Sequence, residues 1–301
     1  MDTQTLKYIG KDLYKTHILK EWKRYIVFMT RCHLHKGQIN DLLDFFKATP
    51  QRQAMLEHTT SFVEQTTRAF FYKDSTWDER IAIVKNHIEY MENIFDDEAI
   101  AKLYVNGERI RLWEDGYEEQ PVVMELWFHG GQRKEGCLSL VLSLGADELY
   151  QIMFWLAPSP EDNELSLWIG ALQGTPNGSE IIKGLTKAFF GYRTKNLIFY
   201  GIRNVAAGLG CKHLYAVSNA GYYAMNHVRR DRKLKTSLDD FWQECEGQVC
   251  KDQRFFEMPI EEYRKSMEEL KPSKRAQHRR RFAKMDEITE SVTEVLNNYK
   301  K

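Results

Sequence analysis

Apolar residues in the first third of the chain recur at steps of three and four, the spacing of a helix that buries one face. Extended alternation of apolar and polar residues is absent over residues 11–95. Two apolar stripes comprise Ile18, Leu19, Trp22, Ile26 and Met29, then Ile81, Ile83, Val84, Ile88, Met91 and Ile94. Ser75 is a plausible N-cap because Asp78 and Glu79 follow it, and negative charge suits a helix N-terminus. The pattern predicts an N-terminal helical region over residues 1–100.

From residue 101 the apolar period becomes that of β-strands. Asn106-Gly107, a dipeptide typical of hairpin turns, divides residues 102–113 into two strand-like runs. Further strands are expected over residues 122–128, 137–144, 152–156 and 165–172, with a turn at Gly130-Gly131. Because short turns join neighbouring runs, the pattern predicts an antiparallel meander rather than a doubly wound parallel sheet.

After residue 172 the pattern changes to helix, helix, strand, over residues 179–190, 197–209 and 213–217. A strand, a loop, a helix and another strand are typical of a β-α-β unit. The last amphipathic helix has a stripe made of Phe282, Met285, Ile288, Val292 and Leu296. The predicted fold class is therefore α+β: a helical N-terminal layer, then a domain over 101–301 with a central, mainly antiparallel sheet and basic C-terminal helices.

Composition narrows the class of protein without naming a function. The 301 residues are 43% hydrophobic and 29% charged, which is ordinary globular usage and argues against a disordered or collagen-like chain. The 43 basic residues balance the 43 acidic ones, so the net charge gives no argument for nucleic-acid or membrane binding. Any such argument depends on local clusters.

The five cysteines are odd in number and scattered, which predicts reduced thiols rather than a disulfide framework. Cys245 and Cys250 lack zinc-site spacing, so no metal is expected. The N-terminus is polar, without the apolar stretch of a secretory signal. The longest apolar run, residues 152–157, is far shorter than the roughly 20 residues of a spanning helix. We expect a soluble, cytoplasmic protein; its oligomeric state does not follow from these patterns.

Ordered sequence blocks over residues 165–285 resemble the VirK/YbjX family of bacterial proteins, a domain of unknown function. The blocks are WIGALQG (168–174), GYRTKNL (191–197), GLG (208–210), AVSN (216–219), FW (241–242), KRA (274–276) and RRR (279–281). One departure is Thr194, where the family commonly has proline. The resemblance implies a helical N-terminal region and a link to virulence, stress and antimicrobial-peptide resistance, but no settled reaction.

Arg193 and Lys195 form the best candidate for an anion site. They precede a predicted helix, whose free N–H groups and dipole favour an anion. Gly191 allows close approach of the backbone, and Asn196 can cap the helix. These residues fit a phosphate or pyrophosphate pocket; the alternative is a solvated basic loop whose asparagine only caps the helix.

With an anion site there, the order of meander, loop, helix and strand looks like the acyl-CoA N-acyltransferase (GNAT-like) fold, where a helix N-terminus holds the cofactor pyrophosphate. Acyl-CoA would then be the donor, and a small molecule or peptide the acceptor. Arg193, Lys195 and Asn196 would hold a phosphate group, while Gln173 and Gly174 would shape the acyl channel. Against this fold, two helices rather than one are expected before the strand at 213–217, and no Gly-x-Gly pair follows the basic residues.

Acyl transfer to an amine also needs a base and an acid. Glu125 or His129 is the candidate base, on the strand VVMELWFH. Ser218, Asn219, Tyr222 and Tyr223 follow the strand at 213–217, where such enzymes often place an acid that protonates the leaving thiolate. Of these, Tyr222 is the catalytic candidate, and Ser218 and Asn219 are candidates for cofactor binding. The alternative for each is a polar residue on an exposed face. Nucleophile elbows, dinucleotide fingerprints and Walker loops are absent.

Seven Lys or Arg residues and no acid over residues 271–285 support a different, non-catalytic hypothesis. An accessory protein could bind an anionic partner, either envelope lipid or nucleic acid, through this segment. The candidate residues are Lys274, Arg275, Arg279, Arg280 and Arg281. A second basic cluster lies at 229–235. Because acid-rich segments at 261–269 and 286–294 flank the first cluster, internal pairing is the alternative. A scaffold with a protein partner on its N-terminal helices is a third hypothesis.

Overall fold

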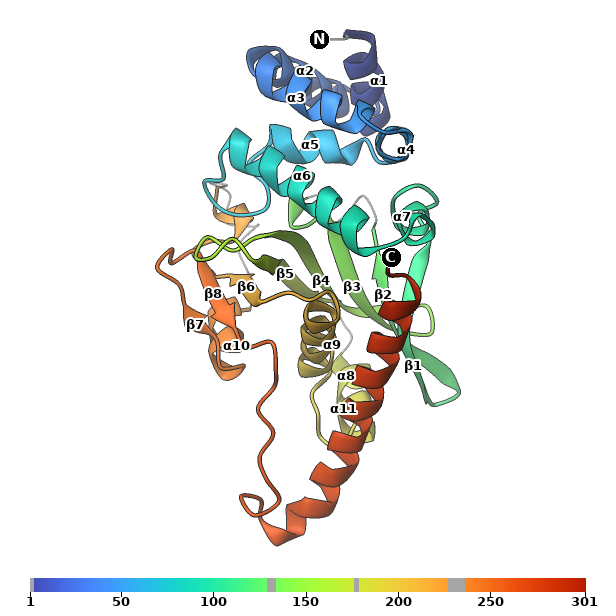
Figure 1. Ribbon diagram of the computed structural model, residues 1–301, viewed down its shortest axis with the longest axis vertical. Helices are drawn as coiled ribbons and strands as arrows, with labels where there is room; N and C mark the ends of the chain where they lie inside the picture. Colours follow the sequence, from blue (N-terminus) through green and yellow to red (C-terminus); the bar gives the residue numbers. More distant parts are fainter. Residues whose placement is uncertain (1–2, 129–133, 176–178, 227–235) are drawn as a thin grey trace.

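A helical layer occupies the N-terminal third of the chain, as the apolar spacing predicts (Figure 1). The first predicted stripe is not a buried face, however, because Ile18, Leu19, Trp22 and Ile26 are exposed. The computed structural model describes residues 3–128, 134–175, 179–226 and 236–301. The N-terminal helices are α1 (Thr3–Leu13), α2 (Leu19–Leu34), α3 (Lys36–Lys47), α4 (Pro50–His58), α5 (Ser61–Thr67), α6 (Trp77–Ile94) and α7 (Asp97–Tyr104). The N-cap of α6 is Thr76, which forms a capping box with Glu79. Ser75, the expected cap, instead donates to the carbonyl oxygen of Phe70 at 2.7 Å.

Eight strands form one sheet, in the order β1-β2-β3-β4-β5-β6-β8-β7. The strands are β1 (Arg109–Tyr117), β2 (Gln120–Trp127), β3 (Leu138–Leu144), β4 (Asp147–Pro158), β5 (Leu165–Gly174), β6 (His213–Val217), β7 (Gln248–Val249) and β8 (Phe255–Met258). Neighbouring strands described by the structure are antiparallel except β5 and β6, which are parallel. The predicted mixed fold with a mainly antiparallel sheet is confirmed.

The predicted hairpin at Asn106-Gly107 is wrong. Residues 97–104 form α7, whose first turn is capped by the Asp96 side chain, so Asn106-Gly107 links a helix to β1. The first hairpin instead joins β1 to β2 through Glu118 and Glu119, both with positive φ. Glutamate rarely adopts this conformation, so no local signal marks the turn.

Helices pack against the sheet from the N-terminal layer and from the C-terminal half of the chain (Figure 1). Helix α6 packs against β4, where Leu156 N donates to His87 Nδ1 at 3.1 Å. Helices α9 (Thr194–Gly208) and α11 (Pro272–Asn298) also contact strands, and α8 (Ser179–Ala188) packs beside α9. At Gly201 of α9 a Cβ atom would lie 2.1 Å from the sulfur of Met124, so this helix approaches β2 closely. The short helices α10 (Leu238–Glu244) and η2 (Tyr223–Asn226) follow β6.

Buried apolar residues of the N-terminal helices and of the sheet belong to one hydrophobic core. The boundary expected near residue 100 falls inside α7. The division into a helical region and an α+β domain therefore stays a prediction.

None of the helices in the described ranges combines the length and the apolar character needed to cross a lipid bilayer. The five cysteines are free thiols, and four of them are buried. No cluster of potential metal ligands occurs among the described residues.

Candidate functional site

A buried carboxyl group, Glu135, lies beside the carboxyl ends of β5 and β6. The residue is 4% exposed. Its Oε1 atom accepts hydrogen bonds from Tyr222 Oη at 2.6 Å and from Gln173 Nε2 at 2.8 Å. Gln173 is the penultimate residue of β5, and Tyr222 lies five residues beyond β6. Ligands of open sheets bind outside the carboxyl ends of parallel strands, so this cluster is the candidate site.

Two glycines allow the backbone around Glu135 to reach the sheet. A Cβ atom at Gly170 would lie 1.8 Å from the carbonyl oxygen of Glu135, and one at Gly136 would lie 2.5 Å from Phe154 N. The register between β4 and β5 shifts between Met153 and Phe154, where Gly170 has no partner in the ladder. The irregularity therefore makes room for the segment that positions the carboxyl group.

Burial raises the pKa of Glu135 to about 6, while the hydrogen bond from Tyr222, the positive charge of Lys134 and the hydrogen bond from Gln173 oppose this rise. The pKa of Tyr222 is raised, first by burial and then by the charge of Glu135. Tyr222 therefore stays a neutral donor at neutral pH, while Glu135 titrates close to it. A carboxyl group with such a pKa is suited to general base catalysis. Gln173 is exposed, so the carboxyl group lies directly beneath the surface.

Ser218 and Asn219 fix the loop that carries Tyr222. Ser218 Oγ donates to the carbonyl oxygen of Gln253 at 2.8 Å and accepts from Gly221 N at 3.0 Å. Asn219 Oδ1 accepts from Leu238 N at 2.7 Å at the start of α10. In this structure both residues hold protein groups, which gives them a positioning role.

The predicted anion site lies at the first turn of α9, which begins three residues earlier than expected. Arg193 is the N-cap, and no side chain caps the helix. The Arg193 side chain is 52% exposed, forms an ion pair with Glu244 and donates from Nε to Asn196 Oδ1 at 3.0 Å. Lys195 Nζ lies 3.8 Å from the ring centroid of Phe241, and burial lowers its pKa. The structure thus brings the three residues together, but a phosphate must compete with Glu244 for Arg193.

The last two residues of β5 point to opposite faces of the sheet. Gln173 reaches Glu135 on one face. At Gly174 a Cβ atom would lie 2.8 Å from Tyr150 Cε1 on the other face. Burial raises the pKa of Tyr150, and the positive charge of Arg193 opposes this rise, so the two side chains interact electrostatically. The end of β5 therefore lies between Glu135 and the first turn of α9.

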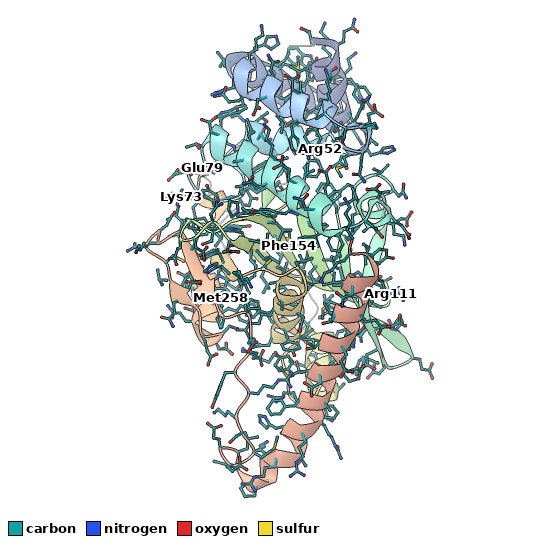
Figure 2. The ribbon with its side chains drawn as sticks, viewed as in Figure 1. Arg52, Lys73, Glu79, Arg111, Phe154 and Met258 are labelled. Carbon is teal, nitrogen blue, oxygen red and sulfur yellow. The ribbon has the colours of Figure 1, made fainter. Side chains whose placement is uncertain are left out.

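The structure does not bring Glu125 to Tyr222. Its carboxylate pairs with Arg109 at 3.1 Å and Arg111 at 3.2 Å. The register places Glu125 on β2, three strands from Gln173. Figure 2 shows Arg111 on the side of the sheet far from Met258 of β8. His129 lies outside the described residues.

Glu135 was missed by the sequence analysis. It stands in a polar stretch before β3, and nothing in its neighbours marks it as buried. The Glu135-Gly136 pair directly before an apolar strand is the only local signal that points to a closely packed backbone.

The basic segment at 271–285 is divided between anchored and exposed side chains. Arg275 Nε donates to the Leu270 carbonyl oxygen at 3.2 Å, and Arg281 Nη2 donates to that of Phe190 at 2.9 Å. Lys274, Arg279 and Arg280 are exposed. Within the described ranges no ion pair joins these three to the flanking acidic segments, which pair elsewhere, as Asp286 does with Arg264. The second cluster, at 229–235, lies outside the described residues.

Comparisons with known proteins identify relatives without an assigned activity. A family model described as "Protein of unknown function (DUF535)" matches residues 17–294. The uncharacterized protein YbjX of Escherichia coli is 28% identical over 194 residues, which are 62% of this chain and 57% of YbjX. An uncharacterized protein of Haemophilus influenzae is 21% identical over 267 residues, 87% of each chain. No solved structure matches. The predicted resemblance to the VirK/YbjX family is confirmed.

Proposed function

The chain belongs to the DUF535 family of proteins of unknown function, and from that premise we propose that it is an acyl-CoA-dependent acyltransferase whose general base is Glu135. The observation that carries this proposal is the buried Glu135 carboxyl group between Tyr222 and Gln173, beside the ends of the parallel strands. Further support comes from the order of meander, helix and parallel strand, a fold-level analogy to GNAT-like enzymes. The acceptor is a small molecule or peptide with a nucleophilic amine or hydroxyl group.

The proposed step transfers the acyl group directly to an amine. The amine nitrogen bonds to the thioester carbonyl carbon, the C–S bond breaks, and the proton of the amine passes to Glu135. Tyr222 gives its proton to the leaving thiolate and receives the proton from Glu135. Because the charge of Glu135 raises the pKa of Tyr222, protonation of Glu135 makes Tyr222 a better acid at the moment when the thiolate leaves.

The donor would lie against the end of β5. Arg193, Lys195 and the first-turn N–H groups of α9 would hold its phosphates. Gln173 and Gly174 would line the path from these phosphates to Glu135. This assignment replaces Glu125 as the base, because two arginines already hold the Glu125 carboxylate.

The test measures thiol release from a panel of CoA thioesters in the presence of small and peptide amines. Glu135→Gln should lower kcat by about 10²- to 10⁴-fold, as loss of a general base does. Thermal unfolding with the thioesters should show that this variant still binds the donor, since a ligand of the native state raises the transition.

The control variant is Glu125→Gln, which tests the other candidate base. It should keep kcat within about threefold if its folding is intact, because its role here is an ion pair. Full turnover by Glu135→Gln would overturn the assignment of the base. Absence of any shift in thermal unfolding with every thioester would overturn the acyltransferase proposal itself.

A second candidate function rests on the exposed cations of α11. Lys274, Arg279 and Arg280 form no ion pair with described residues, so their charges are available to an anionic partner. Vesicles with anionic lipid and a DNA duplex serve as separate probes. Binding should weaken steeply with salt and fall when Arg279 and Arg280 are changed to glutamine. Binding insensitive to salt would exclude this function.

A further inference from the structure

We infer that a second pocket, whose lining includes none of Glu135, Tyr222 and Gln173, binds an uncharged, planar heteroaromatic ring. The pocket lies between α6, the strands β4–β6 and the segment at 250–255, and its volume is about 750 Å³. This volume is in the range of sites for small organic ligands. Figure 2 shows Glu79, one of the lining residues, at the start of α6 near Lys73.

Aromatic side chains form much of the wall. The rings of Trp168 and Tyr215 have centroids 4.2 Å apart, and Phe255 meets Trp168 edge-on at 5.0 Å. Tyr72 and Trp155 complete the group. Faces and edges of such rings attract another flat aromatic ring, which gains stacking energy beyond the burial of its area.

Three of the five charged residues of the wall, Glu79, Asp252 and Arg254, already have partners. The other two, Glu161 and Lys251, are exposed and opposite in charge. Arg254 binds Asp252 at 2.7 Å and donates to the carbonyl oxygen of Lys73 at 3.0 Å. Glu79 accepts from Thr76 N at 2.6 Å in the capping box of α6. A charged ligand would have to break these pairs, so the pocket favours a neutral one.

Two polar groups of the wall indicate that the aromatic ring of the ligand carries nitrogen atoms. The indole Nε1 of Trp168 is buried and has no hydrogen-bond partner among the described residues. A buried donor without an acceptor is costly, so an acceptor atom on the ligand gains affinity there. Asn86 also lines the pocket, and its amide group can both donate and accept. A hydrocarbon ring would leave the indole N–H unpaired.

The residues of the proposed acyltransferase site do not line this pocket, although Tyr72 of its wall forms a β-bridge with Tyr222. Its lining includes Pro158, Pro160 and Glu161, which lie where β4 ends and the connection to β5 starts. Gln173 is at the opposite end of β5, where its side chain reaches the Glu135 carboxyl group, while the Glu135 carbonyl oxygen lies against Gly170. The inference therefore does not rest on the proposed function.

The test compares two ligands of the same shape, quinazoline, which has two ring nitrogens, and naphthalene, which has none. Binding to the full chain is measured by ligand-observed NMR. We expect quinazoline to bind about tenfold more tightly, because only quinazoline offers an acceptor to Trp168 Nε1. Trp168→Phe keeps a ring but removes the N–H donor, so it should reduce this ratio to about twofold or less.

Two further variants locate the binding. Ala82 is an exposed lining residue on α6, so Ala82→Trp should block the pocket without disturbing the core. The matched control is Ala283→Trp, at an exposed position of α11, which should bind both rings as the parent does. Equal affinity for the two rings, absence of quinazoline binding, or binding that survives Ala82→Trp would each overturn the inference.

Discussion

Glu135 shows how one residue acquires unusual properties from its surroundings. Its carboxyl group is nearly removed from water, which raises its pKa, and two neutral donors and the charge of Lys134 limit the rise. Tyr222 and Gln173 are 87 and 38 residues away in the chain. The chemistry of this side chain therefore follows from contacts that no local pattern contains.

The raised pKa of Glu135 predicts opposite effects of pH on stability and on activity. A rise from 4.5 to about 6 corresponds to about 2 kcal/mol, which the protonated carboxyl group contributes to folding below pH 4.5 and which is lost as pH rises through 6. Relative to Glu135→Gln, the parent should lose about this much free energy of unfolding between pH 4.5 and 7.5. Urea unfolding of both proteins at these pH values measures the difference.

The activity of the base should change in the other direction, because only the ionised carboxylate accepts a proton. The pH profile of kcat should rise through about pH 6. A flat profile across that pH, with intact folding, would contradict the assignment of Glu135 as the base.

At the scale of elements, β5 organises the candidate site. Glu135 lies on one face of the sheet at the end of β5, and the first turn of α9 lies near the other face. The register shift at Gly170 lets the backbone of Glu135 approach β5 closely. Helix α9 offers N–H groups without a side-chain cap, a local feature that suits an anion. The same turn also holds an ion pair, so its affinity for phosphate depends on Glu244.

Substitution of the two charged residues of this ion pair should therefore change the affinity for the acyl-CoA donor, in opposite directions for Arg193 and Glu244. Arg193→Glu should abolish the thermal shift caused by a CoA thioester, because it places negative charge at the helix N-terminus. Glu244→Gln should raise the affinity several-fold, because Arg193 no longer has a competing carboxylate. Titration calorimetry with the same thioester compares the two variants. Weaker binding by Glu244→Gln would show that Glu244 positions Arg193 rather than competing with the donor.

At the scale of the whole molecule, His213 joins parts of the sheet that are distant in the chain. Its Nδ1 atom contacts Glu257 of β8 at 2.8 Å, and its Nε2 atom contacts Asp162 of the β4–β5 connection at 3.0 Å. These hydrogen bonds, the one to Glu257 first, raise the pKa of His213 above its ordinary value of 6.5. The imidazolium therefore joins two segments that flank the start of β6.

This arrangement predicts a dependence of stability on pH. Because the folded pKa is raised, the stabilisation is complete below about pH 6.5 and is lost as pH rises through the folded value. The parent should therefore exceed His213→Gln in free energy of unfolding by more at pH 6 than at pH 9. Urea unfolding at both pH values provides the measurement. An equal difference at the two values would show that the contacts of His213 do not depend on its charge.

The sequence by itself determined the classes of structure along the chain. Periodicity predicted the N-terminal helices, the antiparallel strands and the stripe of α11, whose residues Met285, Ile288, Val292 and Leu296 are buried. The ordered blocks also predicted the family. These features are local, because a side chain's spacing on a helix or strand fixes which face it joins.

Only the tertiary structure decided which residues meet. In the fold, Asn106-Gly107 connects a helix to a strand, and Glu125 forms ion pairs with two arginines. Glu135 accepts hydrogen bonds from Gln173 and Tyr222. The physical reason is that burial and pKa depend on atoms supplied by distant segments. The sequence therefore named Gln173 and Tyr222 separately, while their common partner became visible only in the folded chain.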